Sequence, residues 1–424
     1  MKTRELVIKE GIKAFFENDY IGTLVYDPGT GKSKLALDII AELGVRTVLI
    51  TSPRTHLKNN WLEEIMKWGD AQVFQSSDHK FRCSYKEHAF DVVIENIQTM
   101  YKRSREYIST FDFIVFDEIH TYTTEKYGEL VRIAYNLNIS RLGLTGTPDI
   151  KEKDFKTEFY EKYCPILYIY NSAAEDGIIN QKKIIALFYE LPEDFSYTVR
   201  TKRKFWNTSE AKHYSYLQKT IDEISEKVKS DWPDEKVLGL HAVYAIRRKD
   251  IDPNLKTLLI KYWWAIKERK TLLWSLKSSA FLAGVVKQEL LKDKNNKILI
   301  FSELTEKADI LSKWSVHSNK SDQHNRELLE KFNLGRIREL SSCQSLTLGL
   351  NLEGANKAIF ESYNSTFTNN TQKQGRLHRL SPDKTATLYY IIPMNTQAQV
   401  WFESAMDTRI YQQRFIENIK KFKL

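Results

Sequence analysis

The pattern of apolar and polar positions first indicates how residues 1–165 fold. Short apolar runs alternate there with stretches in which apolar residues recur at helical spacing. The runs are typical of β-strands and lie at Gly22–Tyr26, Thr47–Thr51, Val92–Glu95, Phe113–Phe116 and Arg141–Leu144. Because helical segments separate several of these runs, the pattern predicts a parallel α/β sheet.

The pattern changes between Pro192 and Leu291, where Lys, Arg and Trp are frequent and strand signals are few. Apolar residues at helical spacing predict helices over Glu210–Lys229 and Leu255–Leu273. Further along, strand signals return with helical stretches between them, at Lys297–Phe301, Glu339–Ser342, Lys357–Phe360 and Thr387–Ile392. We therefore expect three parts: an α/β lobe (1–190), a helical insert (191–290) and a second α/β lobe with a C-terminal helix (291–424).

Composition narrows the class of protein. Of the 424 residues, 42% are hydrophobic and 28% are charged, as in a soluble globular protein. No apolar run approaches the ~20 residues that a membrane span needs, and the basic N-terminus lacks the apolar stretch of a signal peptide. The three cysteines lie far apart and fit neither a disulfide framework nor a metal site. We expect a cytoplasmic protein, in the host cytoplasm if it is viral, whose net charge of +9 favours a polyanionic partner.

A phosphate-binding loop is the strongest local signal. The segment YDPGTGKS, residues 26–33, follows an apolar strand and opens a helical pattern over Leu35–Leu43. Glycines let backbone N–H groups approach phosphates, and the helix start adds a favourable dipole. Lys32 would hold the β- and γ-phosphates and Ser33 would ligate Mg²⁺, and the predicted cofactor contacts are Gly29, Thr30, Gly31, Lys32 and Ser33. The alternative is a glycine-rich turn followed by a chance Lys-Ser pair, and Tyr26 departs from the usual leading Gly or Ala.

An acidic pair follows the apolar run Phe113–Phe116. Phe113–Phe116 runs into Asp117 and Glu118, where Asp117 would hold Mg²⁺ and Glu118 would position the attacking water. Alone, such a pair is commonly a solvated strand end, and the upstream phosphate loop favours catalysis instead. His120 and the segment TGTP, which contains Thr145 and Thr147, would couple the nucleotide state to the rest of the chain. A simple polar strand end and a simple turn are the alternatives for these coupling residues.

Taken with their order, these motifs resemble superfamily 2 helicases that carry a DEAH-like box. Further segments carry the resemblance, and two of them are similar to Swi/Snf-type remodelling ATPases: Val48–Trp68, Val92–Met100, Lys297–Trp314 and Ser341–Ala355. The stretch Ala173–Leu191 resembles small phage-encoded DNA helicases. The resemblance implies two RecA-like parallel-sheet lobes with the helical insert between them, and it implies ATP and Mg²⁺ as cofactors.

The resemblance also assigns residues in the second lobe. The segment QKQGRLHR fits a motif in which Arg379 is the arginine finger, Arg376 a second phosphate contact and Gln372 a group that positions water or phosphate. Its alternative is a solvated basic helix start. Gly349 and Asn351 are further expected nucleotide contacts. The glutamine that usually reads adenine is missing from Met1–Ile21, so Arg4 or another residue substitutes or the base is read loosely.

Nucleic-acid contacts are carried over from the same motifs. The candidates are polar or basic residues at element ends, which suit phosphate contact without base reading: Ser52, Pro53, Arg54, Gln98, Thr99, Ser302 and Thr347. A loop polar residue is the alternative for each. The insert adds cations that could equally be a solvated face: Arg200, Lys202, Arg203, Lys204, Arg247, Arg248 and Lys249. Glu210–Lys229 is similar in placement to the helical protrusion of remodelling ATPases, which favours duplex or branched DNA over RNA, with single strands also possible.

We therefore expect a monomeric, ATP-dependent DNA helicase or translocase that acts in replication, recombination or repair, with a protein partner choosing the substrate. No membrane contact is expected. An RNA helicase shares the nucleotide chemistry and is the second hypothesis. A nucleotide-gated binding subunit of a larger complex is the third, and it would show a defective catalytic residue, whereas Lys32, Glu118, Arg376 and Arg379 are all present.

Overall fold

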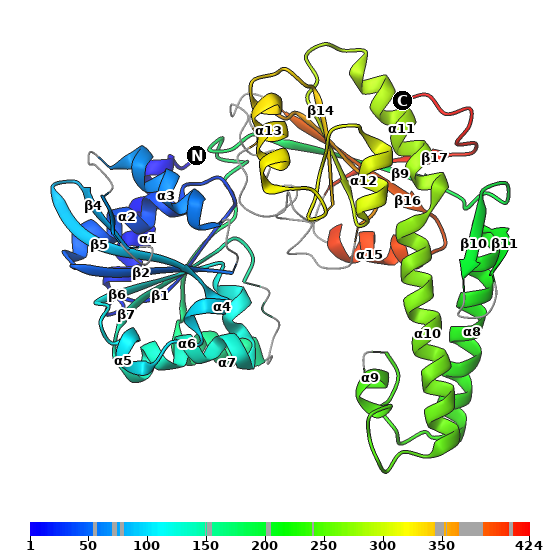
Figure 1. The fold of residues 1–424 in the computed structure, drawn as a ribbon, viewed down its shortest axis with the longest axis horizontal. Coiled ribbons are helices and arrows are strands. Elements are labelled where there is room, and N and C mark those ends of the chain that lie inside the picture. Colours follow the sequence, from blue (N-terminus) through cyan, green and yellow to red (C-terminus); the bar gives the residue numbers. More distant parts are fainter. Residues whose placement is uncertain are drawn as a thin grey trace. The chain divides into compact units, whose positions relative to one another are not determined.

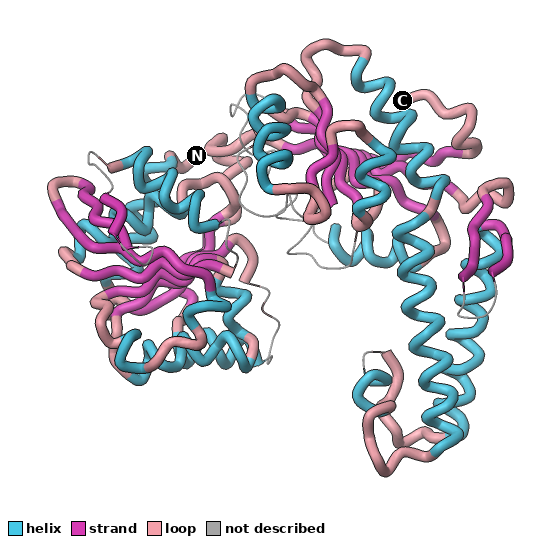
Figure 2. The backbone as a smooth tube through the Cα atoms, viewed as in Figure 1, coloured by secondary structure: helices cyan, strands magenta, loops and turns pink. Residues whose placement is uncertain are grey.

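The computed structural model describes residues 1–53, 57–69, 74–76, 80–148, 150, 155–200, 205–239, 241–343, 352, 354–363, 385–406 and 410–424. The chain forms two compact units. Met1–Lys182 makes up most of the first, whereas Lys183–Ser345 and Thr387–Leu424 make up most of the second. Each unit contains a twisted sheet flanked by helices (Figures 1 and 2), and both are RecA-like lobes.

In the part of the chain that the structure describes, the first unit has a sheet with strand order β3-β4-β5-β2-β6-β7-β1-β8. The central strands are parallel, as the alternation of strands and helices predicts. Its elements are α1 (Arg4–Phe16), β1 (Ile21–Tyr26), α2 (Lys32–Leu43), β2 (Thr47–Ser52), α3 (Leu57–Trp68), β3 (Phe74–Ser76), β4 (Lys80–Tyr85), β5 (His88–Asn96), α4 (Ile97–Met100), α5 (Arg105–Ile108), β6 (Phe113–Asp117), the 3₁₀ helix η2 (Ile119–Thr123), α6 (Glu125–Asn136), β7 (Ser140–Thr145), α7 (Phe155–Tyr163) and β8 (Ile166–Tyr170).

Two apolar cores lie on the two faces of this sheet. One core joins the strands to α1, α2 and α3, through side chains such as Phe15, Leu35 and Trp61. The other joins them to α4, α5, α6 and α7, through side chains such as Leu130 and Phe159. Because helices cover both faces of the sheet, the central strands are almost continuously apolar. This explains why β6 could be predicted from its apolar run.

The second unit contains, among its described residues, a sheet with strand order β13-β14-β12-β15-β16-β9-β17. Strands β12, β14, β15 and β16 pair in parallel. Its elements are β9 (Lys182–Tyr189), β10 (Ser196–Arg200), β11 (Phe205–Ser209), α8 (Glu210–Asp231), α9 (His241–Ala245), α10 (Pro253–Ser275), α11 (Lys277–Leu291), β12 (Ile298–Ser302), α12 (Thr305–Leu311), β13 (Ser315–Val316), α13 (Asp322–Asn333), β14 (Glu339–Cys343), β15 (Lys357–Phe360), β16 (Ala386–Pro393), α15 (Gln397–Met406) and β17 (Gln412–Ile416).

A helical arm extends from this second sheet. Helices α8 and α10 lie side by side, and α9 lies at the end of the pair that is farthest from the sheet (Figure 1). An apolar seam that includes Leu217, Ile221, Leu255 and Leu259 holds the arm together. It has the helical spacing on which the helices were predicted. Ser209 caps α8 and Asp252 caps α10, so both helices begin where the sequence places a capping residue.

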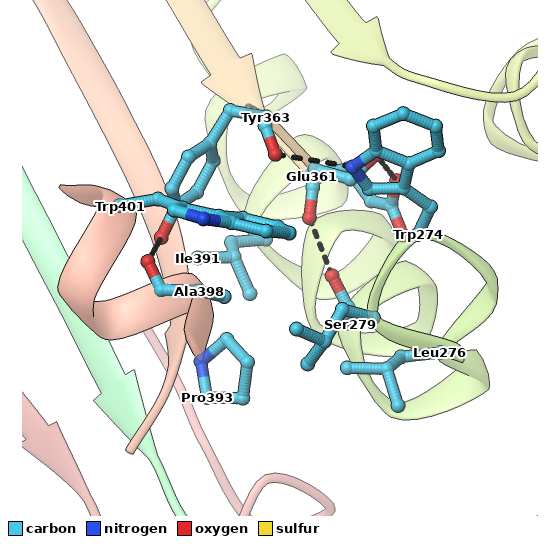
Figure 3. Close-up of a pocket in the computed structure, with 11 residues that line it drawn as sticks. Trp274, Leu276, Ser279, Glu361, Tyr363, Ile391, Pro393, Ala398 and Trp401 are labelled. Carbon is cyan, nitrogen blue, oxygen red and sulfur yellow. Dashed lines mark hydrogen bonds between the residues drawn. The ribbon is translucent and has the colours of Figure 1, made fainter. Parts of the chain in front are cut away.

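The root of the arm packs on the end of the second sheet. The indole N–H of Trp274 donates a hydrogen bond to the Tyr363 carbonyl (3.2 Å), and the Ser279 hydroxyl donates one to the Glu361 carbonyl (2.6 Å). Trp401 and Pro393 face these groups across a small pocket (Figure 3). The root of the arm is therefore bonded to the segment that follows β15, and it faces the end of β16 across the pocket.

The nine strands predicted from apolar runs are all confirmed, with ends shifted by a few residues. Those not predicted are β3, β4, β8, β9, the β10–β11 hairpin, β13 and β17. The hairpin lies within the stretch that was expected to be helical. Strand β9 precedes residue 190 and pairs in the second sheet, where β17 follows the C-terminal helix α15. Among the described residues, no helix is both long and apolar enough to cross a membrane.

Candidate active site

The candidate residues of the first unit meet at one edge of its sheet. Strands β1, β6 and β7 are parallel, and their register pairs Val25 with Thr145 and Asp117 with Leu144. The loop after β1, the acidic pair after β6 and the turn after β7 therefore leave the sheet at the same edge. Carboxyl ends of parallel strands are where open α/β sheets bind ligands.

The loop after β1 has the backbone geometry that phosphate binding requires. Gly29 and Gly31 adopt positive φ values of 90° and 106°, which residues with a side chain rarely reach. Helix α2 begins at Lys32, and its N-cap Gly31 makes no side-chain capping bond. The first N–H groups of the helix thus point out of its start without a side-chain acceptor. The Lys32 amine lies over the loop and donates a hydrogen bond to the Tyr26 carbonyl (3.2 Å).

Tyr26, the departure from the usual loop pattern, points into the core of the unit. Its ring is buried beside Tyr168, and its hydroxyl donates a hydrogen bond to the Val7 carbonyl of α1 (3.0 Å). Gly11 makes room for it, because a Cβ at that position would lie 1.9 Å from the Tyr26 hydroxyl oxygen. The bulky residue is therefore accommodated by α1 and leaves the phosphate side of the loop clear.

The acidic pair is electrostatically strained. Burial, and secondly the charge of Glu118, raise the pKa of Asp117 to about 7, against the opposing effects of Trp61 and Lys32. The indole N–H of Trp61 donates a hydrogen bond to Asp117 Oδ2 (2.9 Å). Sequence reasoning missed Trp61, although it lies in Val48–Trp68, one of the segments that carry the resemblance. The available signal was the indole N–H, since a buried tryptophan usually finds a hydrogen-bond partner for it.

Glu118 has a left-handed backbone, with φ 51° and ψ 53°. Such a conformation costs energy for a residue with a side chain, and it is frequent at active sites. It turns the chain directly from β6 into η2, so that Glu118 and His120 both face Thr145. His120 Nδ1 lies 2.9 Å from the Thr145 hydroxyl, and Glu118 Oε2 lies 3.4 Å from the same oxygen.

The Thr145 hydroxyl is the centre of these bonds. It accepts the Thr147 N–H (3.1 Å) and carries a single proton, which it can donate to Glu118 or to His120 but not to both. Gly146 lies against the phosphate loop, since a Cβ there would be 3.2 Å from the Tyr26 carbonyl oxygen. The predicted coupling residues are thus gathered beside the acidic pair and the loop.

The flank of the loop is formed by the N-terminal helix and by residues 173–179. Asp27 accepts a hydrogen bond from the Ala173 N–H (3.3 Å), and burial raises the pKa of this carboxyl group. Arg4 donates from Nη2 to the Ile178 carbonyl (3.0 Å), so its guanidinium lies where the N-terminal helix meets this segment. This is the region in which a substitute for the missing adenine-reading glutamine was expected.

The candidate nucleic-acid contacts are placed differently from one another. The Gln98 side chain is exposed and donates to the Pro53 carbonyl (2.9 Å), while the Thr99 N–H donates to the Asn96 side chain, which caps α4. These groups lie at the ends of β2 and β5, which are parallel neighbours. Ser52 is fully buried, and so is Ser302 in the second unit, where its hydroxyl donates to the Leu304 carbonyl (3.3 Å).

Several expected residues lie outside the described part of the chain. They are Arg54, Thr347, Gly349, Asn351, Gln372, Arg376 and Arg379. Three cations of the insert, Lys202, Arg203 and Lys204, also lie outside it. Arg248 is described and is held by Glu235 (2.8 Å) and Asp250 (3.1 Å), which is the solvated-face alternative for that residue.

The described residues fit a magnesium nucleotide. The start of α2 offers uncapped N–H groups and the Lys32 amine for phosphate oxygens. Ser33 follows Lys32 at the same helix start. The carboxyl group of Asp117 is disfavoured as an anion by burial and by Glu118, and a divalent cation would remove that penalty.

Comparisons with known proteins agree with this arrangement. Residues 2–150 match the family model described as "Type III restriction enzyme, res subunit", and residues 282–381 match "Helicase conserved C-terminal domain". Over 400 residues the chain is 26% identical to the DNA 3'-5' translocase XPB2 of Sulfurisphaera tokodaii, covering 91% of this chain and 81% of that protein. It is 27% identical over 127 residues to the probable helicase D10 of Escherichia phage T5, covering 30% of this chain and 26% of that one.

Solved structures share the fold. The DNA-bound Type ISP restriction-modification enzyme LlaBIII superposes with a TM-score of 0.59 at 13% identity, over 98% of this chain and 31% of that one. Dbp5 of S. cerevisiae, bound to RNA and ADP BeF3, superposes with a TM-score of 0.55 at 11% identity, over 98% of this chain and 90% of that one. The two family models, the relatives and the shared fold identify the chain as a member of superfamily 2 of helicases and translocases, which are nucleic-acid-dependent ATPases.

Proposed function

We propose that the chain is a DNA translocase that uses ATP and Mg²⁺, and that it moves along duplex or branched DNA. The observation that carries the ATPase half of the proposal is the single sheet edge where an uncapped helix start, Lys32 and a strained acidic pair meet. The DNA half is supported by the similarity to a DNA translocase over 91% of the chain and by the net charge of +9.

The first unit supplies most of the chemistry in this proposal. Lys32 exchanges the Tyr26 carbonyl for phosphate oxygens, and the N–H groups of the α2 start bind the same phosphates. Ser33 and Asp117 would hold Mg²⁺, which when bound would supply positive charge beside the phosphates. Glu118 accepts a proton from the attacking water, and its left-handed backbone fixes the direction in which its carboxylate points.

The Thr145 hydroxyl has a single proton, so it can donate a hydrogen bond to Glu118 or to His120 at one time. When Glu118 turns toward water, the proton moves to His120, and the bond to the Thr147 N–H stays in place. The Thr145 hydroxyl therefore links Glu118 and His120 to the turn that contains Thr147. We propose Gln372, Arg376 and Arg379 as the groups that the second unit brings to the phosphates, with Gly349 and Asn351 as further nucleotide contacts.

DNA contacts are proposed for the exposed groups at the ends of β2 and β5. Pro53, Gln98 and Thr99 lie there, with Arg54 and Thr347 as further candidates. Ser52 and Ser302 are buried as whole residues, so the described structure does not favour a phosphate contact at either of them. The proposal also includes a cytoplasmic location and a monomeric state. It places the chain in replication, recombination or repair, with a protein partner that selects the substrate.

ATP hydrolysis measured with forked duplex, linear duplex, single-stranded DNA and RNA tests this function. Duplex or forked DNA is expected to stimulate turnover most, and stimulation by RNA alone would make the chain an RNA helicase. If no nucleic acid stimulated turnover, the motor function itself would be wrong. Glu118→Gln is expected to bind ATP without hydrolysing it, and Arg379→Ala is expected to lower turnover by about 10³-fold or more.

A further inference from the structure

One side of the arm helix α10 carries tryptophan and lysine side chains that the core of the arm does not use. They recur every three or four residues, which places them on one face of the helix. We name this the tryptophan–lysine face, and its members are Lys256, Ile260, Trp263, Trp264, Lys267, Lys270 and Trp274. Ile260 is 52% exposed and Trp264 is 39% exposed, whereas the arm's core uses other positions of α10, such as Leu255 and Leu259. The face therefore exposes apolar area that folding does not require.

Two of the tryptophan rings on this face hold lysine side chains. The Lys267 amine lies 5.6 Å from the centroid of the Trp263 ring, and the Lys270 amine lies 4.4 Å from that of Trp274. Attraction to a ring restricts where an ammonium group lies. Trp274 is itself fixed, because its indole N–H donates to the Tyr363 carbonyl (3.2 Å). Since the two lysines are already positioned, they lose less conformational freedom when they bind an anion.

The tryptophan–lysine face contains no carboxylate. Lys256, Lys267 and Lys270 form no ion pair with any residue that the structure describes. Helix α10 contains one acidic residue, Glu268, which lies off this face. Its carboxylate accepts a hydrogen bond from the Tyr197 hydroxyl (3.2 Å) and lies 3.5 Å from His213 Nε2 of α8. The positive charge of the face is thus not neutralised within the arm.

The other long helix of the arm has no such excess of charge. The exposed charged residues of α8 balance one another: Lys212, Lys219, Lys227 and Lys229 against Asp222, Glu223, Glu226 and Asp231. The stretch Glu210–Lys229, which the sequence resemblance compares with a DNA-tracking protrusion, is therefore the neutral side of the arm. Uncompensated cations confined to one helix face favour a polyanion at that face.

We propose that the tryptophan–lysine face of α10 binds the phosphate backbone of duplex DNA. Lys256, Lys267 and Lys270 contact phosphates, while the exposed parts of Ile260 and Trp264 pack against the sugars. At 1.5 Å per residue the lysines span about 20 Å of helix, which matches about six nucleotides along one strand of a duplex. Lysine amines lie over two of the three rings, so the face suits backbone contact rather than base stacking.

This inference rests on the proposed function and deepens it. The contacts proposed above at the ends of β2 and β5 belong to the first unit, whereas α10 belongs to the second unit. A translocase needs a grip on DNA from each of its two moving parts. The tryptophan–lysine face supplies such a grip from residues that the structure describes.

Fluorescence anisotropy of a labelled linear DNA duplex, measured without nucleotide over a series of salt concentrations, tests the proposal. Lys267→Gln/Lys270→Gln removes two exposed cations and keeps a similar helix propensity. The slope of log affinity against log salt concentration is expected to become shallower by about 2, and affinity near about 0.1 M salt should fall about tenfold or more. Lys227→Gln/Lys229→Gln is the matched control. It removes the same charge from exposed positions of α8 and should keep the slope within about 0.5 of the wild type.

Trp263→Leu tests whether the ring positions the cation. Leucine keeps an apolar side chain but removes the attraction for the Lys267 amine. Affinity for the duplex is expected to fall about two- to fivefold, while the slope stays as in the wild type because the number of phosphate contacts is unchanged. Trp263→Phe keeps an aromatic ring and should restore most of the affinity.

Two results would overturn the proposal. One is an unchanged slope in Lys267→Gln/Lys270→Gln. The other is an equal change of slope in the α8 control, because DNA would then respond only to the net charge of the arm. In both cases the wild type still binds duplex DNA, so the proposed function stands. A wild type that binds no DNA would refute the proposed function and this inference together.

Discussion

Trp61→Phe tests how the magnesium ligand proposed at Asp117 is held in place. The indole N–H of Trp61 donates to Asp117 Oδ2 over 2.9 Å, and the side chain is 3% exposed. Phenylalanine keeps most of the buried ring but removes the donor. The Asp117 carboxylate then loses the bond that fixes its orientation beside Glu118, and its ionised form loses a stabilising partner.

The size of the effect follows from the kind of bond that is lost. A hydrogen bond to a charged group contributes about 1.5–3 kcal/mol when both partners are buried. Asp117 keeps some contact with solvent, so the lower end of this range applies. About 1.4 kcal/mol corresponds to a tenfold change in an equilibrium constant. We therefore expect the Mg²⁺ concentration for half-maximal ATP hydrolysis to rise about tenfold, which agrees with the effect of losing other groups that orient metal ligands.

The assay is a Mg²⁺ titration of ATP hydrolysis at saturating ATP and DNA. Trp68→Phe is the matched control, because Trp68 lies on the same helix α3 and donates to Glu64 over the same 2.9 Å, but at an exposed position. It should leave the titration unchanged. At saturating Mg²⁺, Trp61→Phe should regain turnover to within about twofold of the wild type. A titration that coincides with that of the wild type would show that the indole does not hold the carboxylate.

Three further changes test the surroundings of the site and the arm. Gly11→Ala should destabilise the first unit by about 1–3 kcal/mol, because its Cβ would lie 1.9 Å from the Tyr26 hydroxyl. In thermal unfolding, adding Tyr26→Phe should recover part of that stability, since it removes the hydroxyl. If the losses of stability in the two single variants simply added up in the double variant, the contact would be refuted. Thr145→Val should leave ATP binding intact but abolish the stimulation of hydrolysis by DNA, and unchanged stimulation would remove Thr145 from the coupling. Glu210→Ala should destabilise the second unit by about 3 kcal/mol in denaturant unfolding followed by tryptophan fluorescence. It removes the acceptor of the Lys277 N–H and of the Ser278 hydroxyl, which keeps only its contact with Tyr189. Burial raises the pKa of Glu210, so the free energy of unfolding of the wild type falls as pH rises through that pKa. Glu210→Gln should cost less stability than Glu210→Ala. This cost should shrink over the same pH interval, because only the wild type is destabilised there.

The sequence predicted the parts of the fold whose residues behave alike over a whole element. Strands β2, β6 and β12 are buried on both faces, so their apolar runs are unmistakable. The hairpin was missed because it has one attached face, an exposed aromatic tip and a connection of basic residues, which together resemble a polar loop. Strand β9 was not predicted, and its residues were placed within the first lobe, because the sheet that a strand joins depends on pairings distant in sequence.

The candidate site shows the same limit at the scale of single residues. The position of Lys32, Asp117 and Glu118 at one sheet edge was predictable, because each belongs to a local signature at or just after the end of a strand. Trp61 and Gly11 were not, because their roles are defined only by the residue they touch, Asp117 in one case and Tyr26 in the other. Those contacts join separate segments of the sequence, and neither a tryptophan nor a glycine indicates from its type alone which residue it will contact.

The buried charges of the second unit explain why the arm and the hairpin belong mechanically to that unit. Lys307 and Glu361 are both buried, pair over 3.2 Å, and Lys307 also donates to the Leu276 carbonyl at the junction of α10 and α11. Glu210 binds the start of α11 directly after that junction. Burying three charged groups costs free energy that an apolar junction would avoid, so the gain lies in a defined geometry. These bonds run from the end of β15 to the first residue of α8, so they join the second sheet to the base of the arm and of the hairpin.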